Sequence, residues 1–274
     1  MENLKKLLSE YDAVIFFDTE TTGLDAESKD ELGQQIQVIE LAAKRLELDK
    51  NQNVIVTSEM DDFIKLPEGN VIPPTIIKFN EIHGTGINDN FLKENGMSET
   101  DACKKFETLA KGNVIFVAYN AQFDLCMVRE MLNRSGSDKM LIDRNDVLDP
   151  LTIFKAIKTY LVDEEVCKTK YPNIDSSKLN GHKLETALLY FNVADKFKNS
   201  HRAIDDCEAL IEITKQLYKT TDVSKWVNTI GYNPKYGLNG KKHPKTIYFE
   251  QEYLKNVQKT HSETIDKTDE EIEK

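Results

Sequence analysis

Two carboxylates stand at the end of a short apolar run near the start of the chain. Residues 13–17, AVIFF, favour a buried strand, and Asp18 and Glu20 follow directly in FFDTETTGLD. Side chains at i and i+2 of a strand point to the same face, so both carboxylates project together. Two close carboxylates repel each other, and hard divalent cations such as Mg²⁺ relieve that repulsion. The pair indicates a metal site, and a solvated loop that begins at this point is the alternative.

A third carboxylate, Asp124, follows the apolar run NVIFVAY at residues 113–119. A helix over 121–134 places an apolar stripe on its inner face and Asp124 at the margin of that stripe. From there the carboxylate reaches the strand end that carries Asp18. An acidic residue near a helix N-terminus is also stabilised by the helix dipole, which is the simpler alternative for this residue taken alone.

The segment HRAIDDCEALIEITKQL, residues 201–217, supplies a fourth carboxylate and a histidine. On a helix, Asp206 falls within the apolar arc, whereas Asp205 points nearly opposite, towards solvent. His201 lies five residues before Asp206, which is not a same-face helical spacing. We therefore expect His201 on the loop before the helix, free to lean over the acidic site. Taken alone, a lone histidine is more often structural.

These side chains require a sheet whose strand ends meet at one edge. The predicted strands cover residues 13–17, 36–48, 53–58, 113–119 and 146–149. The predicted helices lie near residues 75–82, 98–111, 121–134, 150–162, 182–191 and 202–219. A polar connection is predicted at 163–181. This order predicts an α/β or α+β sheet with helices packed on it.

Composition limits the class of protein. The chain has 274 residues, 39% of them apolar and 30% charged, which is typical of a globular protein. No run approaches a membrane helix in length and no signal peptide is visible, so a cytoplasmic location and no membrane partner are expected. The four cysteines form no CxxC pair, and we expect inert thiols. The net charge of −11 argues against tight unaided nucleic-acid binding, which divalent cations can offset.

Taken together, the motifs resemble the DEDDh branch of the DEDD exonuclease superfamily, which includes the proofreading epsilon subunit and the exonuclease domain of bacterial replicative polymerases. The first motif is the run from Asp18 to Leu24, DTETTGL. The second is YNAQFD, residues 119–124, and the third is His201 followed by Asp206. The resemblance spans roughly residues 10–220. It implies an RNase H-like fold, a mixed β-sheet flanked by helices.

The resemblance also implies roles for these residues in a 3′→5′ exonuclease that releases nucleoside 5′-monophosphates. Asp18, Glu20 and Asp206 would hold one of two divalent metal ions, Mg²⁺ or alternatively Mn²⁺. Asp18 would bridge to the second, which Asp124 would support. His201 would act as the general base on the attacking water.

A substrate pocket is implied by the same resemblance. The residues expected to hold the 3′-terminal nucleotide are Thr21, Thr22, Leu24, Asn120 and Phe123. Turn geometry and packing are the alternative roles for them. Tyr119 stands where many relatives have a histidine, so a substrate contact by this residue is in doubt.

The chain extends beyond the minimal domain of residues 1–220. Residues 221–260 form a predicted C-terminal extension, within which residues 225–249 hold five lysines and no acidic residue; residues 261–274 are a charged tail predicted to be disordered. The basic stretch could grip single-stranded nucleic acid, dock a partner or simply pack on the domain. The expected substrate is the 3′ end of DNA, preferably single-stranded, with a DNA polymerase as an expected partner. An RNA exonuclease and a catalytically silent nucleic-acid-binding subunit are the alternatives.

Overall fold

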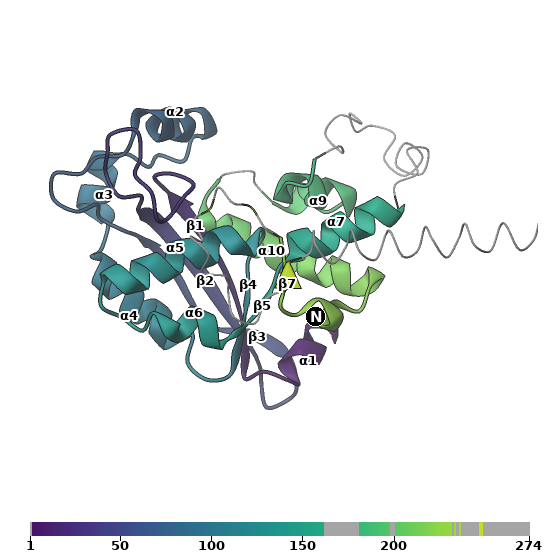
Figure 1. Ribbon diagram of the computed structural model, residues 1–274. Coiled ribbons are helices and arrows are strands. Elements are labelled where there is room, and N and C mark those ends of the chain that lie inside the picture. Colours follow the sequence, from purple (N-terminus) through teal and green to yellow (C-terminus); the bar gives the residue numbers. More distant parts are fainter. Residues whose placement is uncertain are drawn as a thin grey trace, which may run out of the picture.

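A five-stranded mixed sheet forms the centre of the molecule (Figure 1). The computed structural model describes residues 2–161, 181–197, 201–231, 233, 236 and 247–248. The strands are β1 (Ala13–Thr21), β2 (Val38–Leu48), β3 (Val54–Phe63), β4 (Val114–Val117) and β5 (Asp146–Leu148), in the order β3-β2-β1-β4-β5. β2 is antiparallel to both β1 and β3, whereas β4 runs parallel to both β1 and β5. The predicted mixed sheet is confirmed.

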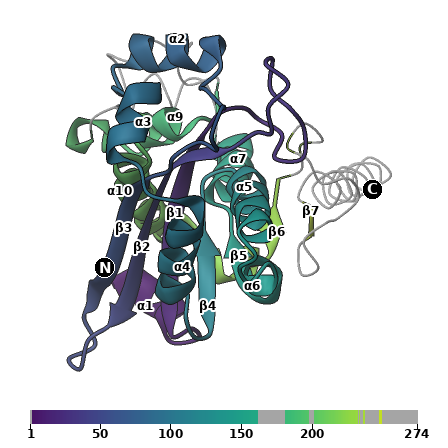
Figure 2. The ribbon, with the colours of Figure 1, turned by 90° about the vertical axis from the view of Figure 1, so that its left-hand side faces the viewer.

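Helices cover both faces of the sheet because β1 is apolar on both (Figure 2). Ile15 and Phe17 pack on one side, and Val14 and Phe16 on the other, as the alternation of a strand requires. The first face is covered by α4 (Glu99–Leu109), α5 (Ala121–Arg134) and α6 (Met140–Arg144). The second is covered by α1 (Glu2–Leu8), α7 (Pro150–Leu161), α9 (Leu184–Tyr190) and α10 (Ala203–Thr220). The result is a three-layer sandwich.

Two short helices lie beyond the end of the sheet at which β1 terminates (Figure 1). They are α2 (Pro74–His83) and α3 (Asp89–Asn95). A small apolar cluster that includes Ile39 of β2 and Leu92 of α3 holds them there. The remaining elements are the 3-10 turns η2 (Ala194–Lys196) and η3 (Val223–Trp226), and a two-stranded parallel sheet of β6 (Thr229–Ile230) and β7 (Ile247–Tyr248).

The observed elements follow most of the predicted ranges. The helix predicted over 121–134 is α5 with the same bounds. The third strand is longer than the predicted 53–58, because β3 continues as an edge strand through polar residues to Phe63. The sequence patterns did not predict α1, α3 or α6. The predicted connection 163–181 lies outside the described residues except for Gly181, and so does the tail 261–274.

The described cysteines are buried free thiols, as predicted: Cys103, Cys126 and Cys207. Cys167 lies outside the described residues. Within the described part of the chain, every helix is too short or too polar to cross a lipid bilayer.

Candidate active site

Three carboxylates converge where β1 ends against α10. Asp18 and Glu20 on β1 and Asp206 on α10 each offer an oxygen, and these oxygens lie within 4.8 Å of one another. The helix approaches the sheet closely because the facing side chains are small: Ala42 packs against Ala203 and Cys207. This contact turns Asp206 towards β1, as the helical projection predicted.

Burial and mutual repulsion govern the charges in this cluster. Burial raises the pKa of Asp18 well above its usual value, and the neighbouring carboxylates of Asp124 and Asp206 raise it further. The pKa of Glu20 is raised in the same way, first by burial and then by Glu40. The pKa of Asp206 is raised to about 6 by burial and by Asp205 beside it. The cluster therefore holds more negative charge than its surroundings compensate.

Asp124 joins the cluster from the first turn of α5. Its Oδ1 accepts hydrogen bonds from the backbone N–H of Thr19 at 3.0 Å and from the Thr19 hydroxyl at 2.7 Å. These bonds fix the start of α5 to the end of β1. Burial raises the pKa of Asp124 to about 7 although the bonds from Thr19 oppose the shift. Asp124 stands close enough to raise the pKa of Asp18, but outside the group of three oxygens.

A divalent cation fits this donor set. The converging ligands are all carboxylate oxygens, which hard ions such as Mg²⁺ and Mn²⁺ prefer. Burial first, and neighbouring carboxylates second, raise the pKa values of these groups, and a bound cation favours their ionised forms.

Glu40 is a fifth carboxylate at the site, which the sequence patterns did not single out. It lies directly opposite Glu20 in the β1–β2 register and is fully buried. Its Oε1 accepts a hydrogen bond from Nε of Arg202 at 2.9 Å, whereas Oε2 has no partner. Burial raises the pKa of Glu40 to about 7 although Arg202 opposes the shift. A glutamate inside the apolar run VIELAA was the signal that could have revealed it.

His201 lies on the loop before α10, as predicted, at the rim of the site. Its backbone is left-handed, with φ of 46°, a conformation that is uncommon for non-glycine residues. The ring packs on His83 of α2, with centroids 4.0 Å apart, and on Phe79 at 5.4 Å. Burial, followed by the neighbouring His83, lowers the pKa of His201, so its imidazole is neutral at pH 7.

Asp205 differs from its predicted position. The helical projection placed it on the solvent face, but the residue is only partly exposed, and its carboxylate raises the pKa of Asp206. Asp205 is outside the group of three converging oxygens.

The predicted substrate residues occupy the turns beside the cluster. Thr21 donates from its hydroxyl to the carbonyl of Gly23 at 2.6 Å. Thr22 is buried, and its hydroxyl accepts a hydrogen bond from the N–H of Gln37, so this side chain fixes the turn. Leu24 is 60% exposed at the surface.

The turn from β4 into α5 also combines partly exposed groups with structural ones. Asn120 has a left-handed backbone, with φ of 69°, where β4 passes into α5. Phe123 is partly buried and packs on the core. The hydroxyl of Tyr119 donates to the carbonyl of His182 at 2.7 Å, which ties the start of α9 to the sheet. The hydroxyl of Tyr119, the residue that departs from the histidine of many relatives, is therefore engaged within the protein.

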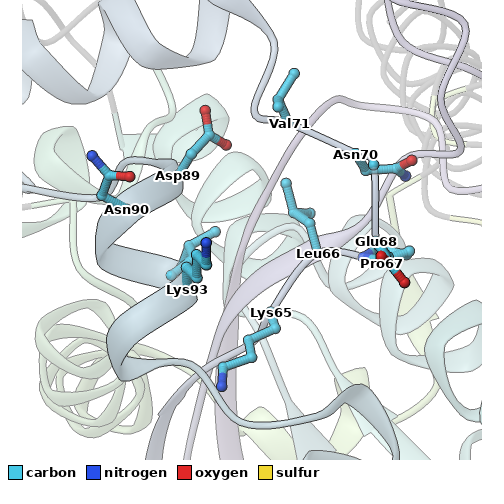
Figure 3. Close-up of a pocket in the computed structure, with 11 residues that line it drawn as sticks. Lys65, Leu66, Pro67, Glu68, Asn70, Val71, Asp89, Asn90 and Lys93 are labelled. Atoms are coloured by element: carbon cyan, nitrogen blue, oxygen red, sulfur yellow. The ribbon is translucent and has the colours of Figure 1, made fainter.

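A surface pocket of about 450 Å³ lies between the loop after β3 and α3 (Figure 3). Its walls include Lys65, Leu66, Asp89 and Lys93, and none of the predicted site residues lines it. Asp89 accepts a hydrogen bond from the N–H of Ile72 at 2.7 Å and so serves the loop structure. The acidic cluster is therefore separate from this pocket.

Comparison with known proteins places the chain in a family of enzymes. Residues 15–214 match the sequence model of the RNase T family, described as exonuclease. The PolC-type DNA polymerase III of Listeria innocua is 29% identical over 203 residues, which are 74% of this chain and 11% of the polymerase. That of Oceanobacillus iheyensis is 28% identical over 90% of this chain and 15% of its own length. The chain thus spans a small part of these relatives.

Solved structures show the same fold at low sequence identity. E. coli exonuclease I in complex with a dT13 oligonucleotide aligns with a TM-score of 0.55 and 20% identity, over 75% of this chain and 41% of that one. The S. pombe Pop2p structure in its Mg²⁺- and Mn²⁺-bound form aligns with a TM-score of 0.56 and 13% identity, over 84% and 93%. The predicted DEDD-type exonuclease with an RNase H-like fold is confirmed at the level of family and fold. The chain belongs to the RNase T exonuclease family.

Proposed function

We propose that this protein is a metal-dependent 3′→5′ exonuclease that hydrolyses DNA from the 3′ end to nucleoside 5′-monophosphates. The observation that carries the proposal is the convergence of Asp18, Glu20 and Asp206 within 4.8 Å in a chain of the exonuclease family. A catalytically silent subunit is disfavoured, because the carboxylates assemble into one cation-binding group.

Each residue has a proposed task. Asp18, Glu20 and Asp206 would hold one divalent ion, and Asp18 with Asp124 would hold the second. Bound divalent ions lower the pKa of water and stabilise charge on the attacked phosphate and the leaving oxygen. His201, whose lowered pKa favours the neutral imidazole at pH 7, would accept the proton of the attacking water. Thr21, Thr22, Leu24, Asn120 and Phe123 position the terminal nucleotide.

The preference for DNA rests on the relatives and neighbours. The matched relatives are PolC-type DNA polymerases, and exonuclease I is solved with DNA oligonucleotides. We therefore place the activity in DNA replication or repair, in the cytoplasm, with single-stranded 3′ ends as substrate and a DNA polymerase as partner. RNA is the competing substrate, because a neighbour of the same fold is the RNase domain of yeast Pop2.

A degradation assay with 5′-labelled oligonucleotides tests the proposal. Single-stranded DNA, a mismatched duplex and RNA of the same sequence are incubated with Mg²⁺, with Mn²⁺, or with EDTA. We expect stepwise shortening of single-stranded DNA that needs the metal and is faster than for RNA. Faster shortening of RNA would reverse the substrate assignment, and no shortening of any substrate with metal would refute an exonuclease.

A further inference from the structure

The segment after α10 pairs with the edge strand β5 and continues past the carboxyl end of that strand. Asn228 donates its N–H to the carbonyl of Val147 at 2.7 Å, and its Oδ1 accepts from the N–H of Val147 at 3.0 Å. β6 consequently lies beside β5 (Figure 2). Further along, Gly231 donates to Asp149, just beyond the carboxyl end of β5, at 3.2 Å. The parallel strands β1, β4 and β5 have their carboxyl ends on the same side of the sheet. The segment therefore reaches the side on which Asp18 lies.

A buried amide fixes this segment to the start of α5. Nε2 of Gln122 donates to the carbonyl of Asn233 at 2.7 Å, and its Oε1 accepts from the N–H of Asn233 at 2.6 Å. The same carbonyl accepts the N–H of Tyr236 at 3.2 Å and closes a turn. Gln122 is 2% exposed, so its donor and its acceptor both serve this contact in a dry environment. The position of Tyr236 is therefore set by the residue two before Asp124.

The turn brings Tyr236 onto Phe123. Their ring centroids are 5.2 Å apart with an angle of 70° between the planes, an edge-to-face pair. Neither ring is fully buried. The pair stands directly before Asp124, beside the left-handed residue Asn120, whose N–H is held by Asp149 at 3.0 Å. Two partly exposed aromatic rings that precede a carboxylate of the acidic cluster in the chain provide apolar surface of the kind on which nucleic-acid bases stack.

We propose that Tyr236 is a substrate-binding residue that forms, together with Phe123, the wall against which the base of the 3′-terminal nucleotide packs. The inference rests on the proposed 3′-end exonuclease. The family match ends at residue 214, so Phe123 lies within the matched part of the chain and the C-terminal extension adds Tyr236 from outside it. Every base has a π-face, so the wall accepts all four bases and favours an unpaired end.

The experiment compares two single-stranded DNA substrates, one with an ordinary 3′-terminal nucleotide and one with an abasic 3′-terminal residue. The full-length wild type, Tyr236→Ala and Tyr236→Phe are measured on both for KM and kcat/KM. Loss of an aromatic–base contact lowers binding by roughly 5- to 150-fold. We expect Tyr236→Ala to raise KM on the ordinary end by at least about fivefold and to leave the abasic end nearly unchanged. Tyr236→Phe keeps the ring and should match the wild type on both.

The outcomes separate the wall from its alternatives. Equal losses on both substrates, or no loss on the ordinary end, would show that Tyr236 only supports the fold and would overturn the inference. A wild type that shortens neither substrate would instead refute the exonuclease itself. Thermal unfolding checks that each variant is folded; if Tyr236→Ala is not, Tyr236→Leu, which keeps apolar volume without the ring, takes its place with the same expected pattern.

Discussion

At the residue scale, neighbouring aspartates on α10 have different surroundings. Asp206 belongs to the converging group of oxygens and Asp205 does not. Asp206→Ala removes a metal ligand and should lower the rate of nucleotide release by roughly 10³-fold or more. Asp205→Ala leaves the ligand set intact and should lower the rate by about tenfold, the lower end of the range for a group that acts through a ligand. Single-turnover rates on single-stranded DNA measure both.

The control for this pair is folding. Both variants should give cooperative thermal unfolding, because each substitution removes charge from a crowded acidic region. Similar rate losses for the two variants would show that Asp205 also binds metal or substrate and that the assignment of Asp206 is incomplete.

The raised pKa values predict how pH affects stability without metal. The pKa of an unfolded aspartate is about 3.9, whereas burial in the folded protein raises the pKa of Asp206 to about 6 and that of Asp124 to about 7. A group whose pKa is raised on folding contributes stability below its unfolded pKa and loses it as pH rises through the folded value. The contribution of these two groups should therefore lower the melting temperature measured in EDTA as the pH is raised from 4 to 8.

Metal addition reverses this loss. Mg²⁺ binds the ionised carboxylates, so the increase in unfolding temperature on adding it should grow from pH 5 to pH 8. Asp206→Asn should unfold at a higher temperature than the wild type in EDTA at pH 8 and respond less to Mg²⁺. A pH-independent effect of Mg²⁺ would contradict a binding site made of these carboxylates.

At the element scale, Arg202 joins the start of α10 to the ends of β2 and β3. Its guanidinium bonds to the buried Glu40, lies 3.8 Å from Asp61 and stacks over the ring of Phe63 at 4.6 Å. Because Arg202 directly follows His201, these contacts also orient the proposed base. Arg202→Ala leaves Glu40 buried without its partner and should lower the free energy of unfolding by about 3 kcal/mol.

Two comparisons identify the source of this loss. The double variant with Glu40→Gln should lose less than the sum of the single variants in urea unfolding, because no unpaired charge remains. Arg129→Ala breaks an ion pair with Asp143 in α6, away from the site, and should lower stability without lowering kcat. If Arg202→Ala behaves like Arg129→Ala in kinetics, Arg202 has no part in orienting His201.

Periodicity explains which elements the sequence could predict. α5 has a long apolar stripe and a clear breaker before it, and its bounds were predicted. α3 buries only Leu92 and begins with an Asn88 side-chain cap, so its pattern is too short to recognise. Motif spacing was enough to predict that Asp18, Glu20 and Asp206 lie close together, whereas their roles in a site stay a prediction. Glu40 was missed because its role depends on the strand register that places it opposite Glu20.

At the scale of the whole molecule, net charge opposes substrate binding. The chain has a formal net charge of −11 at pH 7, whereas affinity for nucleic acid depends mainly on contacts between phosphates and positively charged groups. Binding to single-stranded DNA with a hydrolysis-resistant 3′ phosphorothioate should be weaker than roughly 10⁻⁴–10⁻⁶ M in EDTA, the range of ordinary non-specific binding. With Mg²⁺ it should tighten at least about tenfold, since the metals supply the missing positive charge.

Fluorescence anisotropy of the labelled oligonucleotide measures this difference at constant ionic strength. Equal affinity with and without Mg²⁺ would indicate that lysines of the chain, including those in residues 225–249, hold the DNA by themselves.

The contact between Gln122 and Asn233 joins residues 111 positions apart, but its entropic cost is small. α10 already packs on β1 and β2, so only the residues between Thr220 and Asn233 remain to be ordered. The cost of closing a loop grows with the logarithm of its length, and this last loop is short. The tether keeps Tyr236 at a high effective concentration beside α5, so the protein gains an aromatic wall at the site without enlarging its hydrophobic core.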